Sequence, residues 1–170
     1  MNNKKCNVES CNNSAFSKGF CKFHVPKKRK ERLDFNMENL HSLSTSDLKR
    51  VADYWLRQYL LRYSSGFGER IWCPLKKQSY HVSKMQVAHF IDRACMNTRY
   101  DLDNCHLVSE QSNVWDAQIP KEGYKSLHHY EYEMWLGEEK VKILLEKSKI
   151  IRKFAKEDYI EIINSFKNEY

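Results

Sequence analysis

Four side chains near the start of the chain have the types and spacing of a metal site. Cys6, Cys11, Cys21 and His24 form the pattern Cys-x4-Cys-x9-Cys-x2-His. Thiolates and imidazoles are ligands that zinc binds in a tetrahedron, and two short ligand pairs separated by a loop bring four donors around one point. Because the protein supplies all four ligands, we expect a closed, structural zinc site and not a catalytic one.

The segment around these ligands has little apolar mass of its own. Its larger apolar side chains are Val8, Phe16, Phe20 and Phe23. A structural zinc contributes roughly 10–16 kcal/mol of apparent folding free energy in such units, so the metal replaces the missing core. Gly19 suits a tight turn before the second ligand pair. The alternative is that three cysteines are incidental in a disordered tail, but their clustering beside a histidine favours zinc.

A second set of side chains has the chemistry of phosphodiester hydrolysis. His89 comes first, Asn104 follows an aspartate, and Asn113 lies further along. Hydrolysis needs a base to activate water and a cation to stabilise charge on the phosphate. A neutral imidazole suits the base, and an asparagine carbonyl suits magnesium or manganese. Taken singly, each residue has a structural explanation as a hydrogen-bonding histidine, a turn or a helix surface. The ordered set, with arginines between its members, favours a site.

The hydrophobic pattern predicts the elements that carry these residues. Residues 86–91 predict a strand and 105–108 a second, joined by a polar loop and followed by a helix from Ser109. Upstream, Ser44 or Ser46 can cap a helix that ends at 64–66. One face of that helix is apolar at helical spacing: Leu48, Val51, Ala52, Trp55, Leu56, Tyr59, Leu60 and Tyr63. Residues 124–170 predict further helices, broken at Gly137 and near Ser148, with the apolar positions Leu127, Tyr130, Met134, Val141, Leu144, Leu145, Ile160, Ile163 and Phe166.

Composition and charge narrow the class of protein. The 170 residues are 41% hydrophobic and 13% aromatic, which excludes a wholly disordered chain. No apolar run is long enough to span a membrane, and the start lacks a secretory signal, so we expect a cytosolic protein without disulfides. The formal net charge of +7 favours a polyanionic partner. A basic run at Lys27, Lys28, Arg29 and Lys30 is equally consistent with nucleic-acid contact and with a solvated linker.

The second set of residues lies in a stretch that resembles the NinG (Rap) family of phage recombination endonucleases. That family carries a motif close to Gly-His-Phe/Tyr-x-x-Arg, then Arg-Phe/Tyr/Trp, then Asp-Asn-x-His, then Cys-Asn. The matching positions here are His89-Phe90, Arg93, Arg99-Tyr100, Asp103-Asn104, His106 and Asn113. Segments 52–62 and 132–141 are also similar to the family, so the resemblance covers roughly residues 43–150 in order. The N-terminal cluster is similar to short units at the start of phage endonuclease-like proteins.

The resemblance implies an α+β fold with a ββα-metal (HNH-like) core surrounded by helices and an N-terminal zinc knuckle. We expect a zinc knuckle at 1–25, a basic linker at 26–36 and a nuclease domain at 37–170. The implied function is a metal-dependent DNA endonuclease that cuts branched (Holliday-junction-like), structured or duplex DNA in the cytosol of a phage host. Besides the structural zinc, it would use Mg²⁺ or Mn²⁺. The sequence leaves a homodimer open.

Each residue of the second set takes a role in this hypothesis. His89 is the general base, and Asn104 belongs to the expected catalytic set as the residue that holds the hairpin loop through side-chain hydrogen bonds. Asn113 is the first choice of ligand for the catalytic divalent ion, with His106 the weaker candidate. Arg93 and Arg99 are expected to meet phosphates, because a guanidinium offers a bidentate fork. The further expected DNA contacts are Arg57, Arg62, Lys27, Lys28, Arg29 and Lys30.

The sequence also departs from the family. Where the family has two further cysteine pairs, this chain has Cys73 with Lys76, and Ser109 with Ser112. One cysteine cannot hold a zinc, so we expect no second zinc and interpret Cys73, Cys95 and Cys105 as small buried residues. Ala88, directly before the base, cannot bind metal, and either His106 or Asp92 could complete the shell. Two alternatives stay open: a non-catalytic DNA-binding or phage regulatory protein with a degenerate HNH fold, and an RNA-binding zinc-knuckle protein.

Overall fold

The computed structural model divides the chain into two compact units, Met1–Asp34 and Phe35–Tyr170. It describes residues 5–16, 19–24, 35, 39–64 and 69–168. The division falls inside the segment expected as a basic linker. Lys27, Lys28, Arg29 and Lys30 lie outside the described residues, so their expected contact with DNA has no structural counterpart here.

Turns and short bridges build the first unit. Lys5 pairs with Ser14 in an isolated antiparallel bridge, and the amide of Cys6 donates to the carbonyl of Asn13 at 3.0 Å. Gly19 has a φ of 82°, and a Cβ at this position would clash with the side chain of Asn7. The tight turn expected at this glycine is therefore confirmed, and the reason is both backbone conformation and space.

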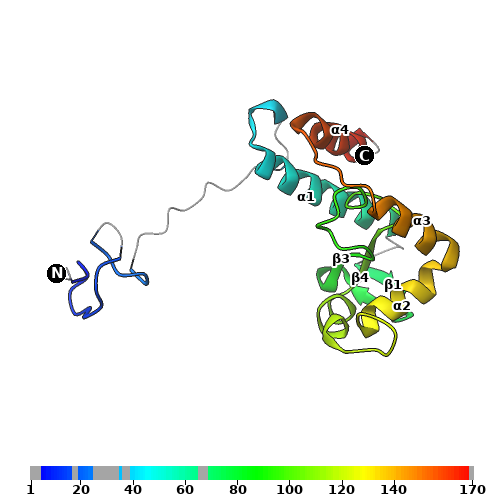
Figure 1. The fold of residues 1–170 in the computed structure, drawn as a ribbon, viewed down its shortest axis with the longest axis horizontal. Coiled ribbons are helices and arrows are strands. Elements are labelled where there is room, and N and C mark those ends of the chain that lie inside the picture. Colours follow the sequence, from blue (N-terminus) through cyan, green and yellow to red (C-terminus); the bar gives the residue numbers. More distant parts are fainter. Residues whose placement is uncertain (1–4, 17–18, 25–34, 36–38, 65–68, 169–170) are drawn as a thin grey trace. The chain divides into compact units, whose positions relative to one another are not determined.

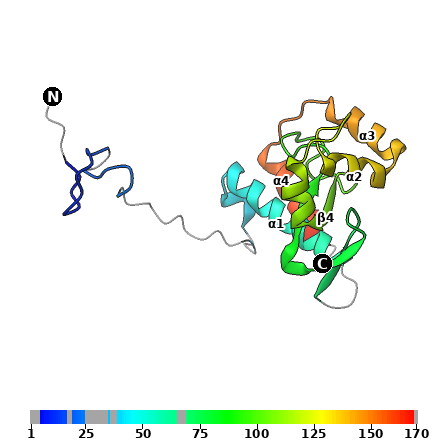
Figure 2. The same cartoon turned by 90° about the horizontal axis from the view of Figure 1, so that it is seen from below.

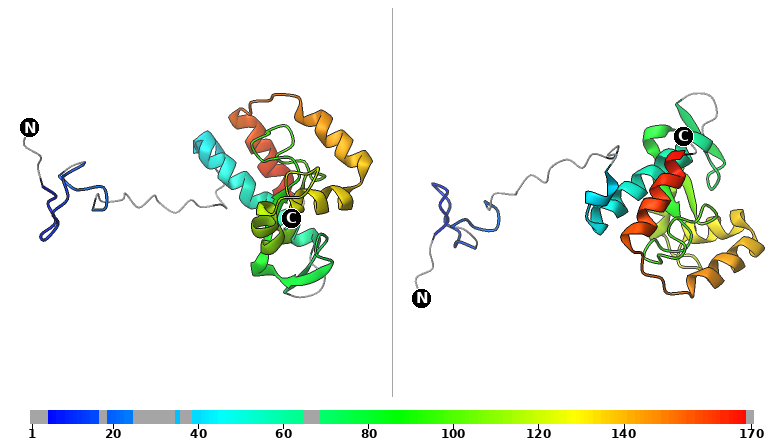
Figure 3. Two further views of the ribbon diagram at one scale, coloured as in Figure 1. Left: turned by 60° about the horizontal axis from the view of Figure 1, so that its bottom comes forward. Right: turned by 90° about the horizontal axis from the view of Figure 1, so that it is seen from above.

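Two long helices pack side by side in the second unit. α1 (Thr45–Ser64) and α4 (Lys156–Asn168) lie next to each other in Figures 1 and 3. Ser44 caps α1, since its Oγ accepts from the amide of Asp47 at 3.2 Å. Six of the expected core positions are buried: Leu48, Val51, Ala52, Trp55, Leu56 and Leu60. Tyr63 is 61% exposed, so the apolar face ends before the last turn.

Two small antiparallel sheets accompany the helices. β3 (Met85–His89) pairs with β4 (Cys105–Ser109), and the register sets His89 opposite Cys105 and Ala88 opposite His106. This hairpin confirms the two predicted strands, although the first ends at His89 instead of 91. The other sheet, β1 (Arg70–Cys73) with β2 (Gln78–His81), was not predicted; its ribbon projects from the body of the second unit in Figure 2.

Short helical segments follow the strands. After β4 the chain forms a π turn, η3 (Gln111–Trp115), and a 3-10 turn, η4 (Asp116–Gln118). The regular helix expected from Ser109 is thus corrected to a short, irregular one. Two further 3-10 turns precede α1 and β3: η1 (Leu40–Ser42) and η2 (Val82–Lys84). The architecture is a mixture of helices and small antiparallel sheets.

Two helices contact the loop that joins β3 to β4, through hydrogen bonds such as those of Tyr132 with Asn104 and of Lys140 with Asp103. α2 (Leu127–Leu136) ends at Gly137, whose φ is 84°, and α3 (Glu138–Ser148) begins directly after it. Both predicted breaks are confirmed. Tyr132 of α2 is fully buried against the hairpin, and its hydroxyl donates to the carbonyl of Asn104 at 3.3 Å. Met134 and Leu145, expected on apolar faces, are 65% and 45% exposed.

The cysteines of the second unit are structural. Cys73 and Cys105 are fully buried, as expected, and Cys95 is half-buried. Lys76 places its ammonium 2.8 Å from Asp116 and 2.9 Å from Glu131. Within the described ranges, the Cys3His group is the single cluster that could hold a metal through cysteine, histidine or carboxylate ligands. In the same residues, no helix combines the length and apolar character needed to cross a membrane.

Candidate functional sites

The N-terminal cluster has the geometry of a tetrahedral metal site. His24 Nδ1 lies 3.5 Å from Cys6 Sγ and 3.4 Å from Cys21 Sγ, and the sulfurs of Cys11 and Cys21 are 3.8 Å apart. All four ligand atoms lie within 4.8 Å of one another. Zinc–ligand bond lengths in a tetrahedron require about 3.8 Å between sulfurs and about 3.6 Å between sulfur and nitrogen. The cluster is therefore compatible with a structural metal ion such as zinc.

The surroundings of Cys6 favour the thiolate that a metal needs. Burial raises the pKa of this thiol, but amide hydrogen bonds from Cys21 and Val8 and a bond to His24 lower it more, to about 6. The amide of Cys21 lies 3.3 Å from the sulfur. A thiolate that forms near neutral pH binds a cation without first having to lose a proton.

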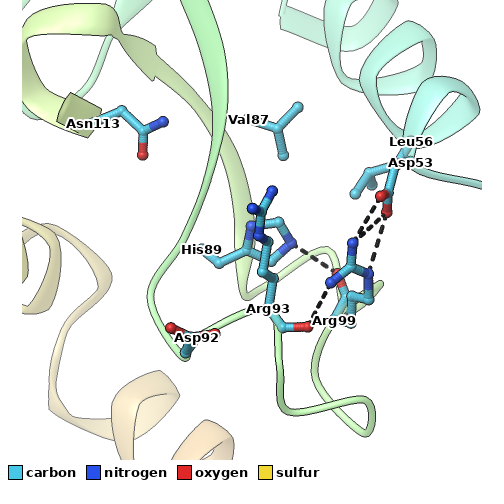
Figure 4. A pocket seen from close by; sticks show the side chains of 8 residues that line it. All are labelled: Asp53, Leu56, Val87, His89, Asp92, Arg93, Arg99 and Asn113. Atoms are coloured by element: carbon cyan, nitrogen blue, oxygen red, sulfur yellow. Dashed lines mark hydrogen bonds and ion pairs between the residues drawn. The ribbon is translucent and has the colours of Figure 1, made fainter. Parts of the chain in front are cut away.

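A second candidate site is an open pocket of about 380 Å³ where α1 meets the β3–β4 hairpin. Figure 4 shows that α1, β3, the hairpin loop and the segment after β4 each contribute to its wall. The lining residues are Asp53, Leu56, Val87, His89, Asp92, Arg93, Arg99 and Asn113. The structure therefore brings together five residues that the sequence singled out, His89, Asp92, Arg93, Arg99 and Asn113.

His89 is held in one tautomer. Its Nε2 lies 3.0 Å from the backbone carbonyl oxygen of Arg99, and because a carbonyl only accepts, Nε2 carries the proton. Nδ1 is then the basic nitrogen. Burial lowers the pKa of His89 below its usual 6.5; the carbonyl bond opposes this, and the positive charges of Arg99 and Arg93 reinforce it. At neutral pH the imidazole is uncharged and can accept a proton at Nδ1.

Asn104 holds the hairpin loop, as predicted. The side chain is fully buried, and its Oδ1 accepts from the amide of Ile91 at 2.7 Å. Its Nδ2 donates to the carbonyls of Ile91 at 3.1 Å and Thr98 at 2.9 Å. These three hydrogen bonds join Asn104, at the end of the loop, to the main chain at its start and near its middle, which gives the side chain a structural role. Asn104 is not among the residues that line the pocket, so its place in the expected catalytic set is that of a residue that holds the loop.

Arg99 was expected to contact phosphate, but its position in the structure argues against this. Arg99 is only 5% exposed, and its guanidinium forms an ion pair with Asp53 of α1, Nη2 to Oδ2 at 2.7 Å. Its Nε donates to the same carboxylate at 3.2 Å, and its Nη1 donates to the carbonyl of Arg93 at 2.6 Å. Donors already used inside the protein are not free for a ligand.

Arg93 and Asn113 are placed differently, because they keep groups available for a ligand. Arg93 is exposed at the pocket, and its guanidinium forms no hydrogen bond or ion pair with the described residues. The Nδ2 of Asn113 donates to Gln86 at 2.8 Å, which leaves Oδ1 as the acceptor of that amide. Asp92, also exposed there, uses Oδ1 to accept from the amide of Ala94 at 2.7 Å.

The structure separates His106 from this pocket. His106 pairs with Ala88, one residue before His89, so its side chain leaves the hairpin on the opposite face. There its ring packs edge-on against Trp135 with a centroid distance of 4.5 Å, and Nε2 donates to the carbonyl of Asp103 at 3.1 Å. The expectation that His106 and Asn113 share a divalent ion is therefore wrong, because His106 lies on the other face of the hairpin.

The remaining predicted DNA contacts also lie outside the pocket. Arg57 is half-buried on α1, and Arg62 is exposed near the end of the same helix. Asp53 is the pocket residue that sequence reasoning missed. The available signal was a carboxylate at the border of the apolar helical face, one turn before Leu56, and its role became clear only with a partner 46 residues away.

Comparisons of the chain with protein-family models, with curated proteins and with solved structures find no match.

Proposed function

We propose that the protein is a metal-dependent DNA endonuclease that hydrolyses phosphodiester bonds in branched (Holliday-junction-like) or structured DNA. The observation that carries the proposal is the pocket in which His89, with Nδ1 as its basic atom, shares a wall with Arg93 and Asn113. The net charge of +7 suits a polyanionic substrate. The resemblance to the phage NinG endonucleases supports the same class of enzyme, and with it a place of action in the host cytosol.

The pocket residues have distinct roles in this reaction. His89 Nδ1 takes a proton from the attacking water. Its Nε2–H keeps its hydrogen bond to the carbonyl oxygen of Arg99 throughout, so the ring does not have to turn. Arg93 binds a phosphate through its free fork. Burial keeps His89 uncharged at neutral pH, which is the form that a general base needs.

The pocket also has donors that fit a hard divalent cation. The carboxylate of Asp92 and the Oδ1 of Asn113 are oxygen ligands of the kind that Mg²⁺ and Mn²⁺ prefer. An ion held by these oxygens would supply positive charge against the phosphate. The sequence left open whether Asp92 or His106 completes the metal shell, and this proposal assigns that role to Asp92.

The N-terminal unit has a separate role in the proposal. Zinc at the Cys3His cluster folds the unit, and the basic run that follows it adds affinity for the DNA backbone without reading sequence. Cutting two strands of a junction requires two active sites, so a homodimer on one junction belongs to the same proposal.

The test is a cleavage assay on the purified full chain. Labelled four-way junction, duplex and single-stranded DNA are incubated with Mg²⁺, with Mn²⁺ or with a chelator. We expect metal-dependent cutting, strongest on the junction, and its loss in His89→Ala. His41→Ala is the matched control, because His41 is exposed and lies outside the pocket. Cutting by His89→Ala at the wild-type rate would refute the assignment.

One observation favours a second function, a DNA-binding protein without catalysis. Ala88 is 1% exposed and offers no ligand, and Asp53 is engaged with Arg99, so Asp92 is the one pocket carboxylate outside an ion pair. This candidate expects junction binding that weakens with salt, without cleavage under any metal condition. The same assay, read alongside a binding titration, separates the two functions.

A further inference from the structure

One ion pair joins α1 to the hairpin loop. The carboxylate of Asp53 accepts three hydrogen bonds from Arg99: from Nη2 at 2.7 and 3.0 Å, and from Nε at 3.2 Å. The Tyr100 hydroxyl adds a fourth at 3.1 Å. Figure 4 shows this pair on the α1 side of the pocket, beside His89.

The same arginine contacts the site through its backbone. Its carbonyl oxygen accepts from His89 Nε2 at 3.0 Å and from the thiol of Cys105 at 3.0 Å. Its Nη1 donates to the carbonyl of Arg93 at 2.6 Å. Arg99 therefore links three parts of the pocket: α1, the chain segment that carries Arg93, and the ring of His89.

We infer that Asp53 and Arg99 are positioning residues, whose ion pair fixes the loop carbonyl that holds His89 with its proton on Nε2. The catalytic consequence rests on the proposed function, whereas the effect on the imidazole does not. Neither side chain contacts substrate in this scheme. A partner that holds a catalytic imidazole in one tautomer matters because the wrong tautomer presents a proton where the base needs a lone pair.

The geometry favours this role over simple packing. Arg99 is buried but the side chain of Asp53 is 41% exposed, and such an ion pair is a weak source of stability, because the desolvation of the arginine offsets much of the attraction. A guanidinium fork is directional, however, and here it sets the loop against α1 while a third nitrogen fixes the carbonyl of Arg93. Hairpin residues 90–104 contain no strand or regular helix, so such cross-links decide where the Arg99 carbonyl lies.

Asp53→Asn tests the inference, because it keeps the shape of the side chain and removes its charge. Asp103→Asn is the matched control: it makes the same chemical change in the hairpin loop and also breaks a helix-to-loop ion pair, that with Lys140 at 2.7 Å. Two readouts are compared, namely single-turnover cleavage with DNA affinity, and the imidazole Nε2–H of His89 in proton–nitrogen NMR spectra.

We expect Asp53→Asn to lower the cleavage rate by roughly 10–100-fold, as loss of an orienting partner typically does, with DNA affinity unchanged. The Nε2–H signal of His89 should exchange with water faster than in the wild type, and Asp103→Asn should match the wild type in both readouts. If Asp53→Asn does not fold, Arg99→Lys replaces it, since lysine can pair with Asp53 but cannot also hold the Arg93 carbonyl.

The two proposals fail in different ways. An unchanged Nε2–H signal in the folded variant would overturn the positioning role, whatever the cleavage rate. A wild-type protein that binds junction DNA but never cuts it would overturn the nuclease, and the NMR comparison would still decide the positioning role. If Asp53→Asn and Asp103→Asn lose equal amounts of cleavage rate and of Nε2–H protection, the ion pair only stabilises the loop in general. That result would overturn the inference.

Discussion

The Nε2 of His89 lies 3.0 Å from the backbone carbonyl oxygen of Arg99, and this bond decides which nitrogen of the ring is basic. The acceptor is a main-chain atom, so substituting the arginine side chain does not delete it. What the side chain controls is where the carbonyl lies, through Asp53 and Arg93. The predictions below follow from this arrangement and from the N-terminal cluster.

The first prediction concerns the pH dependence of cleavage. Burial lowers the pKa of His89, and the charges that face the ring are Asp53 on α1 and Arg93 and Arg99 in the loop. The neutral base is therefore present above that lowered pKa, and kcat/KM should fall only as the pH drops through it. The profile is measured from about pH 5 to pH 8, where histidine titrates. An acid limb centred at or above 6.5 would contradict the assignment.

The same shift makes a prediction about stability. A histidine whose folded-state pKa lies below its unfolded value stabilises the fold above the unfolded value, and the contribution is lost as the pH falls through the folded one. The free energy of unfolding from urea titrations should thus decrease on acidification less steeply in His89→Gln than in the wild type. If the free energy of unfolding depends on pH equally in the two proteins, the titration of His89 does not contribute to the pH dependence of stability.

Asn113→Ala should weaken cleavage through the metal. Removal of Oδ1 takes away an oxygen ligand and leaves the base in place, so the rate at low Mg²⁺ should fall about 10–100-fold and recover in part at high Mg²⁺. Gln118→Ala is the control, since Gln118 belongs to the next helical turn and does not line the pocket. A loss that no Mg²⁺ concentration relieves would argue against ligation.

Arg93→Gln should weaken DNA binding in proportion to one phosphate contact. The logarithm of affinity falls with the logarithm of salt concentration by about 0.9 per neutralised phosphate, so the slope should become shallower by about one. Arg152→Gln removes a charge that is already paired with Asp158 at 2.6 Å and serves as the control. If both variants change the slope equally, Arg93 acts only through net charge.

The N-terminal unit should depend on metal for its fold. We expect about one zinc per chain in protein purified without chelator, and a chelator should unfold this unit while α1–α4 keep their helical signal. Cys21→Ser should lose the metal, whereas Cys95→Ser, outside the cluster, should retain it. Elemental analysis gives the stoichiometry, and a zinc-free wild type with a folded N-terminal unit would contradict the prediction.

Local chemistry was enough to predict several parts of this protein. The ligand set of the knuckle follows from residue type and spacing, because thiolates and imidazole so close in sequence can converge on one point. The cap at Ser44, the buried face of α1 and the break at Gly137 depend on neighbours within one or two helical turns. The hydrogen-bonding role of Asn104 could also be predicted, because a turn asparagine bonds to its own loop.

Other features were decided by contacts between distant segments. The strands β1 and β2 are only four residues long and have mixed polarity, so their local pattern does not predict strands. Their pairing with each other stabilises the extended conformation. The register of β3 with β4 places Ala88 opposite His106, which turns His106 away from His89. Arg99 looks like a phosphate ligand in the sequence, and only the approach of α1 gives it a carboxylate partner. A charged side chain binds the nearest opposite charge that the fold brings within reach, and 46 residues of chain separate Asp53 from Arg99.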